Sequence, residues 1–379
     1  MAQLQGTWDP RFDGVAETLS SSLDAGTDVG ASVAVALDGD LVVDIWGGTV
    51  DEAGTAPWER DTITNVWSTT KTMTFLCALM LADQGELDFY SPVARYWPEF
   101  KAAGKEGVEV RHVMAHTSGL PGWTEPVAPE DLADWDKCTR LLAAQEPWWE
   151  PGTVSGYHAL TQGYLIGEII RRITGETIGT WFAREVAGPL GADFYIGLPA
   201  SEDPRVSFVI PPPPIDFGAV GAEVSKTTIR VFSNPLLDAT YPQREWWRRA
   251  EIPAANGHGN ARSVALVQSI IAGSGEARGT RLLSAGGCEP IFDEQISGTD
   301  LVLSLPNRFG MGYGLRNEFM PIGPRACFWG GYGGSLIVMD LDARLTVCYV
   351  MNRMESGIQG DFRGASIMLA AAAGAVAEG

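Results

Sequence analysis

Basic residues are scarce in this chain of 379 residues, which carries 27 lysines and arginines against 47 aspartates and glutamates. The formal charge of −20 repels the phosphates of nucleic acids and of anionic membranes, so neither is an expected partner. Long apolar runs are also missing, since no stretch approaches the roughly 20 apolar residues that span a bilayer. The N-terminal segment lacks the basic start and the apolar core of a secretory signal. Together these features favour a cytoplasmic protein and leave its oligomeric state open.

Ligand sets for metals and common catalytic signatures are missing as well. The five cysteines lie far apart in the sequence, so they form neither a CxxC redox pair nor a zinc knuckle. His112 and His116 have the spacing of a zinc-binding helix, but Val113 stands where such a helix carries its glutamate. A GxSxG motif is absent, which disfavours a Ser-His-Asp α/β-hydrolase. We therefore expect no metal and no organic cofactor.

Both ends of the chain carry a hairpin pattern beside a helical pattern. Residues 31–48 and 335–352 alternate in hydrophobicity around a central turn, as paired strands do. Helical spacing of apolar residues marks 10–23 and 361–377. This arrangement predicts one antiparallel sheet that is formed by both termini and flanked by helices.

The middle of the chain has a different character. It carries helical patterns between irregular pieces, with a proline-rich extended connector at 209–218. We therefore expect an α+β fold in which residues 1–90 and 285–379 form a discontinuous sheet domain. Residues 91–284 are expected to form an inserted, mostly helical domain.

The segment "NVWSTTKTMTFLCALMLADQGEL" is the first candidate for chemistry. Ser68 precedes Lys71 by three residues, and an apolar helix-like run follows at once. The pattern predicts Ser68 on the first turn of a buried helix, with Lys71 on the same helix face. A lysine in such a helix is costly unless its pKa falls, and a lysine of low pKa beside a hydroxyl can activate a serine nucleophile. The simpler alternative is a serine that caps the helix and a lysine that reaches solvent.

Two later segments add to this pair. Tyr157 follows a Pro-Gly turn just ahead of a helical pattern, where its hydroxyl can transfer protons if Lys71 lies near. The segment "ACFWGGYGGSLIVMD" places four glycines before a strong strand, which lets the backbone approach a ligand closely. It does not fit the GxGxxG pattern of dinucleotide sites. His158 and His258 are possible pocket residues, but a surface role is the expectation for both, and Ser118 is expected to cap its own turn.

The order and spacing of these three elements resemble the serine β-lactamase and penicillin-binding-protein superfamily. The segments "LMLADQGELDFYSPVARYWPEF", "VRHVMAHTSGLPG" and "GYHALTQGYLIGEIIRRITGE" are similar to its class C β-lactamase-like branch. The resemblance covers nearly the whole chain and is weakest from about 200 to 255. It implies a β-lactamase-like fold.

Within that branch the chain resembles the family VIII carboxylesterases. The second motif ends in Ala159 where class C β-lactamases carry asparagine, and the third begins with Trp329 where they carry lysine. The resemblance implies that Ser68 is the nucleophile and that Lys71 and Tyr157 form one proton-transfer unit. It further implies an oxyanion hole made by the backbone N–H groups of Ser68 and Tyr332. The substrate-binding site is expected to be lined by Trp329, Gly330, Gly331 and His158.

The activity implied is hydrolysis of a small-molecule ester, short-chain or aryl, through an acyl-serine. An acyltransferase or an amide or β-lactam hydrolase would use the same catalytic residues, so these alternatives stay open. A binding module that kept only the fold is disfavoured, because Ser68, Lys71 and Tyr157 are all present. Whether Lys71 or Tyr157 is the formal base also stays open, since coupled groups titrate as a pair.

Overall fold

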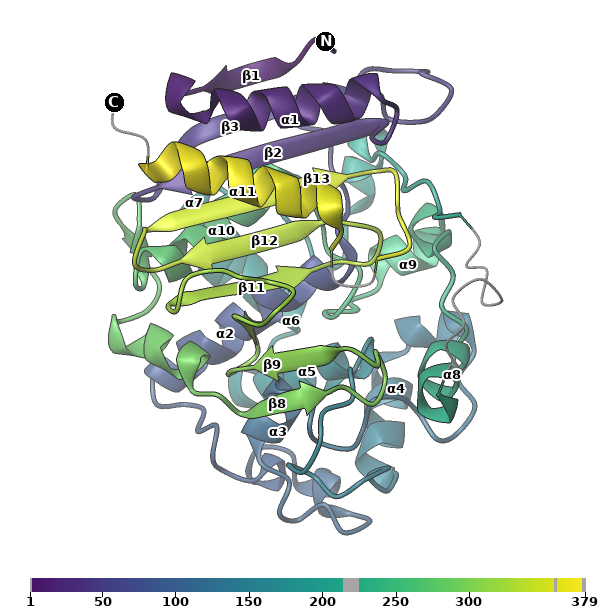
Figure 1. The fold of residues 1–379 in the computed structure, drawn as a ribbon. Coiled ribbons are helices and arrows are strands. Elements are labelled where there is room, and N and C mark those ends of the chain that lie inside the picture. Colours follow the sequence, from purple (N-terminus) through teal and green to yellow (C-terminus); the bar gives the residue numbers. More distant parts are fainter. Residues whose placement is uncertain (1, 214–224, 358–359, 377–379) are drawn as a thin grey trace.

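A nine-stranded antiparallel sheet forms the centre of the computed structural model, which describes residues 2–213, 225–357 and 360–376 (Figure 1). The strands lie in the spatial order β1-β3-β2-β13-β12-β11-β10-β9-β8. Their bounds are β1 Gln5–Trp8, β2 Gly30–Leu37, β3 Asp40–Gly48, β8 Ile296–Thr299, β9 Pro306–Phe309, β10 Gly314–Leu315, β11 Ala326–Gly330, β12 Leu336–Asp340 and β13 Leu345–Met351. Two short pairs lie outside this sheet: β4 Thr64–Asn65 with β5 His258–Gly259, and β6 Glu276–Ala277 with β7 Thr280–Arg281.

The two ends of the chain meet in the middle of the sheet. Strand β13 pairs with β2, with Val347 opposite Val35. The β2–β3 turn places Asp38 at φ 53° and Gly39 at φ 85°, the left-handed backbone that two-residue hairpins prefer. The sheet formed by both termini is thereby confirmed.

Helices cover both faces of the sheet. In Figure 1, α1 and α11 lie in front of the strands, whereas α10 and α2 lie behind them. The helices are α1 Asp13–Asp24, α2 Lys71–Asp83, α3 Val110–Met114, α4 Trp135–Ala144, α5 Thr161–Thr174, α6 Ile178–Phe182, α7 Gly188–Leu190, α8 Lys226–Ser233, α9 Glu245–Arg249, α10 Ala261–Ala272 and α11 Phe362–Val376. Helix α2 is buried on every side from Lys71 to Leu81 and packs against α5, so it is a core helix rather than a surface one.

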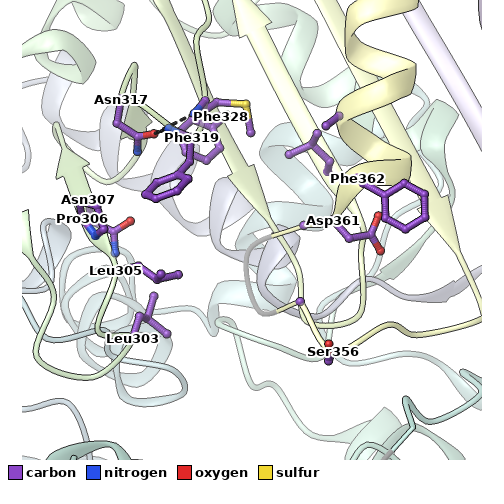
Figure 2. A pocket seen from close by; sticks show the side chains of 15 residues that line it. Leu303, Leu305, Pro306, Asn307, Asn317, Phe319, Phe328, Ser356, Asp361 and Phe362 are labelled. Carbon is purple, nitrogen blue, oxygen red and sulfur yellow. Dashed lines mark hydrogen bonds between the residues drawn. The ribbon is translucent and has the colours of Figure 1, made fainter. Parts of the chain in front are cut away.

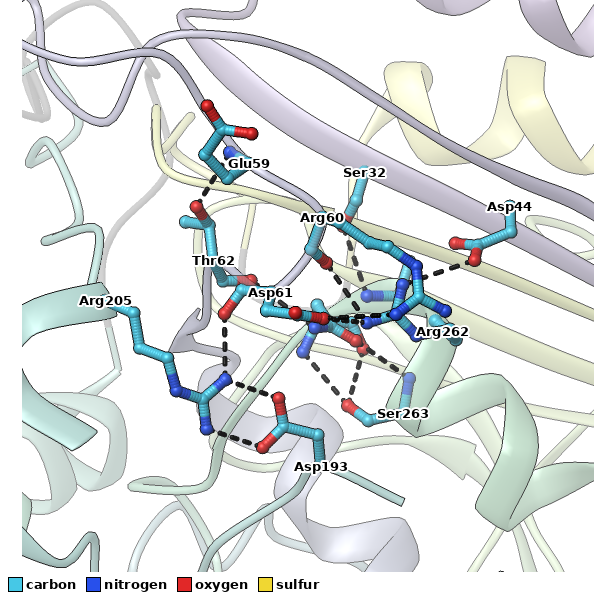
Figure 3. A network of polar contacts seen from close by, with 12 residues as sticks. Ser32, Asp44, Glu59, Arg60, Asp61, Thr62, Asp193, Arg205, Arg262 and Ser263 are labelled. Atoms are coloured by element: carbon cyan, nitrogen blue, oxygen red, sulfur yellow. Dashed lines mark hydrogen bonds and ion pairs between the residues drawn. The ribbon is translucent and has the colours of Figure 1, made fainter. Parts of the chain in front are cut away.

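A network of polar side chains anchors the segment that leads to Ser68 (Figure 3). Arg262, at the start of α10, binds Asp61 at 2.7 Å and Asp44 of β3 at 3.2 Å. Arg205 donates to the backbone carbonyl of Asp61 at 2.8 Å and also pairs with Asp193. Because Asp61 is held from two directions, the chain enters β4 and then the Ser68 turn along a fixed path.

The α+β class predicted from the sequence is confirmed, and both predicted hairpins and both terminal helices are present. The terminal helix is described to Val376, and the connector at 209–218 is described only to residue 213. The domain boundaries stay a prediction. Helix α10 lies inside 91–284 but packs on β2 and β13, so by its contacts it belongs with the sheet.

Candidate active site

Ser68 lies on a strained turn immediately ahead of α2. The turn is a 3-10 helix, Trp67–Thr70, and α2 begins at Lys71. The sequence predicted Ser68 inside the first α-helical turn, so the α-helix begins three residues later than expected. Trp67 has φ 47°, a left-handed conformation that is a genuine outlier for a bulky residue. Its ring packs against Trp247 and Tyr332, each at 5.4 Å between centroids, which offsets this strain.

The structure brings Ser68, Lys71 and Tyr157 into direct contact. The Tyr157 hydroxyl donates to Ser68 Oγ at 2.7 Å, and Lys71 Nζ lies 3.2 Å from the same oxygen. Ser68 is 7 % exposed and the other two are 1 % exposed. The side chains come from three points of the chain: the turn before α2, the start of α2, and the loop before α5. The arrangement predicted from the Ser-x-x-Lys and tyrosine motifs is therefore geometrically present.

Lys71 has polar neighbours but no acidic partner among the described residues. Its Nζ donates to the carbonyl oxygens of Ala159 at 2.8 Å and Ala254 at 2.9 Å. Burial lowers the pKa of Lys71 well below its ordinary value. A neutral amine has two N–H bonds and one lone pair. If the two carbonyls take the N–H bonds, the lone pair is directed at the Ser68 hydroxyl.

The pKa of Tyr157 shifts in the opposite direction to that of Lys71, so both groups favour their neutral forms. Burial raises the pKa of its phenol, and the hydrogen bond to Ser68 only partly offsets this rise. A protonated Tyr157 can donate to Ser68 Oγ while Ser68 donates to a neutral Lys71. The three groups then form one directed chain of hydrogen bonds.

The glycine-rich turn lies directly against the Ser68 turn. A Cβ on Gly331 would stand 2.5 Å from the Val66 carbonyl oxygen, so only glycine fits there. The Ser335 hydroxyl donates to the same oxygen at 3.0 Å and lies 2.9 Å from the Thr69 hydroxyl. Gly330 ends β11, opposite Leu336. These contacts hold the turn that contains Tyr332 against the turn that contains Ser68.

Two residues predicted to line the substrate, Trp329 and His158, have buried side chains. Trp329 is 2 % exposed and packs among Phe75, Phe309 and the ring of Tyr157. His158 is fully buried, with its Nδ1 bonded to the Gly156 carbonyl at 2.6 Å. Both side chains pack against the Tyr157 loop, and their contact with the substrate stays a prediction.

Ser118 and His258 also have internal partners. Ser118 bonds Nε2 of His158 at 2.7 Å, and Nδ1 of His258 bonds the Asn256 carbonyl at 2.7 Å. Burial lowers the pKa of His158 to about 3 and of His258 to about 4, so both rings are neutral. Ser118 and His158 tie two loops together and are closed to solvent.

Asp300 is a supporting residue that the sequence did not reveal. Its Oδ1 accepts the backbone N–H of Tyr157 at 3.0 Å, and those of Val302 and Leu303 at 2.9 Å each. The carboxylate thereby clamps the Tyr157 loop to the turn between β8 and β9. No motif surrounds Asp300, and 143 residues separate it from Tyr157, so no sequence pattern could have linked them.

His116 is a second supporting residue. It takes the left-handed φ of 61°, and its Nδ1 accepts the backbone N–H of His158 at 3.0 Å. Its ring lies 4.9 Å from that of Tyr157. The i,i+4 spacing to His112 drew attention to it only as a possible metal ligand, but its place is behind the tyrosine.

An apolar crevice of about 530 Å³ borders these loops (Figure 2). Leu305 and Phe319 stand on one side and Phe362 on the other, and they are 48, 65 and 65 % exposed. On the first side, Leu303 is bonded to Asp300, which holds Tyr157. On the other, the Gly357 carbonyl accepts the N–H of Gly333, the neighbour of Tyr332. Both walls are thus bonded to the candidate catalytic loops, although Ser68, Lys71 and Tyr157 do not line the crevice themselves.

Within the described ranges, no three His, Cys, Asp or Glu side chains gather as metal ligands would. The five cysteines are all buried and free. Among the described helices, none has the length and hydropathy required to cross a membrane.

Comparison with known proteins identifies the class. The beta-lactamase family model matches residues 16–372, so the chain belongs to the beta-lactamase family. Its relatives include esterases. It is 36 % identical over 371 residues to the esterase/beta-lactamase LipL of Mycobacterium tuberculosis, covering 93 % of this chain and 83 % of LipL. It is 31 % identical to the esterase EstB of Burkholderia gladioli over 46 % of this chain and 51 % of EstB.

A crystal structure of a family VIII carboxylesterase superposes with a TM-score of 0.93 at 40 % identity, covering 98 % of this chain and all of that one. The β-lactamase-like fold and the resemblance to family VIII carboxylesterases, both predicted from the sequence, are confirmed. The protein is a hydrolase of the beta-lactamase-like serine hydrolase superfamily, and its esterase relatives support ester hydrolysis.

Proposed function

We propose that the protein is a serine carboxylesterase that cleaves short-chain or aryl esters through an acyl-serine on Ser68. The observation that carries the proposal is the contact of Ser68 Oγ with both Lys71 Nζ at 3.2 Å and the Tyr157 hydroxyl at 2.7 Å. A buried lysine of lowered pKa is the base that a serine nucleophile needs. No metal or organic cofactor takes part.

In this mechanism Ser68 Oγ attacks the ester carbonyl while its proton passes to Lys71. The backbone N–H groups of Ser68 and Tyr332 hold the oxyanion, and each donor contributes roughly 3–4 kcal/mol. In support, the N–H of Tyr332 has no acceptor among the described residues. Tyr157 gives its proton to the departing alcohol, and Lys71 returns a proton to Tyr157. Water then hydrolyses the acyl-serine.

We further propose that the apolar part of the ester occupies the crevice between Leu305, Phe319 and Phe362. Exposed apolar side chains gathered around a crevice are typical of binding sites. The volume of about 530 Å³ falls in the usual range for small molecules. With this assignment the crevice, and not the ring of Trp329, provides the apolar surface that the ester contacts.

A second candidate activity is β-lactam hydrolysis, since the name of LipL joins esterase and beta-lactamase. The residues weigh against it as the main activity, because Ala159 and Trp329 replace the asparagine and lysine of the class C motifs. An uncharged ester loses no contact by these replacements, whereas a β-lactam carboxylate loses its cationic partner.

The test is labelling with a fluorophosphonate, followed by peptide mapping. We expect one adduct, on Ser68, with parallel loss of p-nitrophenyl butyrate hydrolysis. The Ser68→Ala variant should take no label. Labelling that leaves the activity intact, or a label on another serine, would overturn the proposal.

A further inference from the structure

The indole N–H of Trp329 is a buried donor without an acceptor among the described residues. Leaving such a donor unpaired costs about 1–3 kcal/mol, so its retention calls for an explanation. Trp329 lies on β11 beside Tyr157, with ring centroids 6.3 Å apart and planes inclined by 28°. The unpaired donor therefore belongs to the immediate surroundings of a proposed catalytic group.

The neighbours of Trp329 fix its ring. His116 stacks on the indole at 5.6 Å and 23°, and Phe75 meets it edge-on at 5.3 Å. Phe309 packs at 5.7 Å. With three rings around it, the indole has little freedom to turn its N–H toward another partner.

Tyr157 is the neighbour of Trp329 that becomes an anion in the proposed reaction. Lys71 lies with its Nζ 4.9 Å from the centre of the Tyr157 ring. Burial does most to raise the pKa of Tyr157, and the charge of Asp300 raises it further, whereas Ser68 and Trp329 lower it. His116 and His158 are neutral because burial lowers their pKa values. Besides Ser68, Trp329 is the neighbour that lowers the pKa of Tyr157 and so favours a phenolate.

We propose that Trp329 is a positioning residue whose indole N–H stabilises the Tyr157 phenolate while the alcohol leaves. This inference rests on the proposed esterase function. In that step the Tyr157 O–H bond breaks as its proton moves to the ester oxygen. The carbon–oxygen bond of the tetrahedral intermediate breaks with its electron pair on that oxygen, and the alcohol departs. Lys71, an ammonium since it took the Ser68 proton, then protonates the phenolate.

The contribution of Trp329 is concentrated in this step. An N–H bonded to a phenolate is a charge-assisted hydrogen bond, roughly twice as strong as one to a neutral phenol. An interaction that strengthens only as the reaction proceeds lowers the barrier instead of stabilising the bound substrate. Alkyl esters need a proton on their strongly basic leaving oxygen, whereas p-nitrophenoxide leaves without one.

The experiment compares Trp329→Phe with the unmodified protein on ethyl butyrate and on p-nitrophenyl butyrate. Both esters give the same butyryl-Ser68, so kcat/KM isolates acylation and the leaving group. We expect kcat/KM for ethyl butyrate to fall about 10- to 100-fold, and for p-nitrophenyl butyrate less than about 3-fold. Trp58→Phe is the matched control, because its indole N–H is equally buried and unpaired but is remote from Tyr157. It should change neither value.

Equal losses on both esters would mean that Trp329 only supports the fold, and no loss on ethyl butyrate would mean that its N–H has no part in the step. Either result overturns the inference. If Trp329→Phe folds poorly, benzothienylalanine at position 329 replaces the N–H by sulfur in the same shape. This variant must show the same larger loss of kcat/KM on ethyl butyrate than on p-nitrophenyl butyrate. In a Tyr157→Phe background, replacing Trp329 must affect the two esters equally. If the unmodified protein cleaves neither ester, the proposed function fails instead, and the two failures are distinguishable.

Discussion

Replacing Lys71 by methionine should change how the stability of the protein depends on pH. Methionine nearly keeps the length of the side chain and removes the amine. In the folded protein, burial lowers the pKa of Lys71 well below the ordinary value of 10.5, which the unfolded chain retains. Between those two pKa values the unfolded chain holds one proton more than the folded protein. The free energy of unfolding of the unmodified protein therefore rises with pH in this window, by about 1.4 kcal/mol per pH unit.

The variant lacks this proton, so its stability should not show that rise. From pH 7 to pH 9 the unmodified protein should gain about 3 kcal/mol over Lys71→Met, provided that the folded-state pKa lies below 7. The variant also leaves the Ala159 and Ala254 carbonyls without their donor, at a cost of about 1–3 kcal/mol each. That cost does not depend on pH, so it shifts the difference between the two proteins without altering its slope.

The assay is urea unfolding at pH 7, 8 and 9, followed by tryptophan fluorescence. Lys101→Met, which changes an exposed lysine, is the control and should leave the pH dependence unaltered. Parallel pH profiles for the unmodified protein and Lys71→Met would refute the reasoning. Lys71 would then keep its proton on folding, and it could not be the neutral base that the mechanism requires.

Other expectations can be checked separately. Lys71→Ala and Tyr157→Phe should each lower kcat by orders of magnitude, while the double variant loses far less than the product, since groups that act as a unit are not additive; full additivity would assign them to separate steps. Asp300→Ala should lower the free energy of unfolding by about 3 kcal/mol, because three backbone N–H groups lose their acceptor, and Asp300→Asn should recover most of it in a urea titration. Phe319→Ser should lower kcat/KM for p-nitrophenyl hexanoate more than for the acetate, by about 4-fold per buried methylene lost, and an equal effect on both would remove the acyl chain from the crevice. Nitrocefin should be turned over much more slowly than p-nitrophenyl butyrate, and the reverse order would make the protein chiefly a β-lactamase.

Much of the fold was predictable because it depends on local patterns. The hairpins at 31–48 and 335–352 alternate in hydrophobicity, and the β2–β3 turn uses the Asp-Gly pair that favours left-handed backbone. Ser68 and Lys71 were linked by their spacing on one helical turn. The left-handed Trp67 was not predictable, since a bulky residue adopts that conformation only where tertiary packing holds its ring.

The surroundings of the site were less predictable, because they depend on long-range pairing. Trp329 begins the third motif, but only the pairing of β11 with β12, Trp329 opposite Ile337, turns its ring into the core beside Phe75. Asp300 acts through backbone N–H groups of a loop distant in sequence, and such an acceptor leaves no periodic signal. The sequence therefore predicted the three side chains that the structure brings into contact, but not the residues that hold them.

The most direct test of the account is the mass of the protein after it is mixed with a slowly deacylating ester. The mechanism predicts a mass increase of one acyl group, which peptide mapping assigns to Ser68, and which decays at the rate of product release. Ser68→Ala should show no adduct under the same conditions. Continued hydrolysis by Ser68→Ala, or an adduct that maps to another residue, would contradict the claim that Ser68 is the nucleophile.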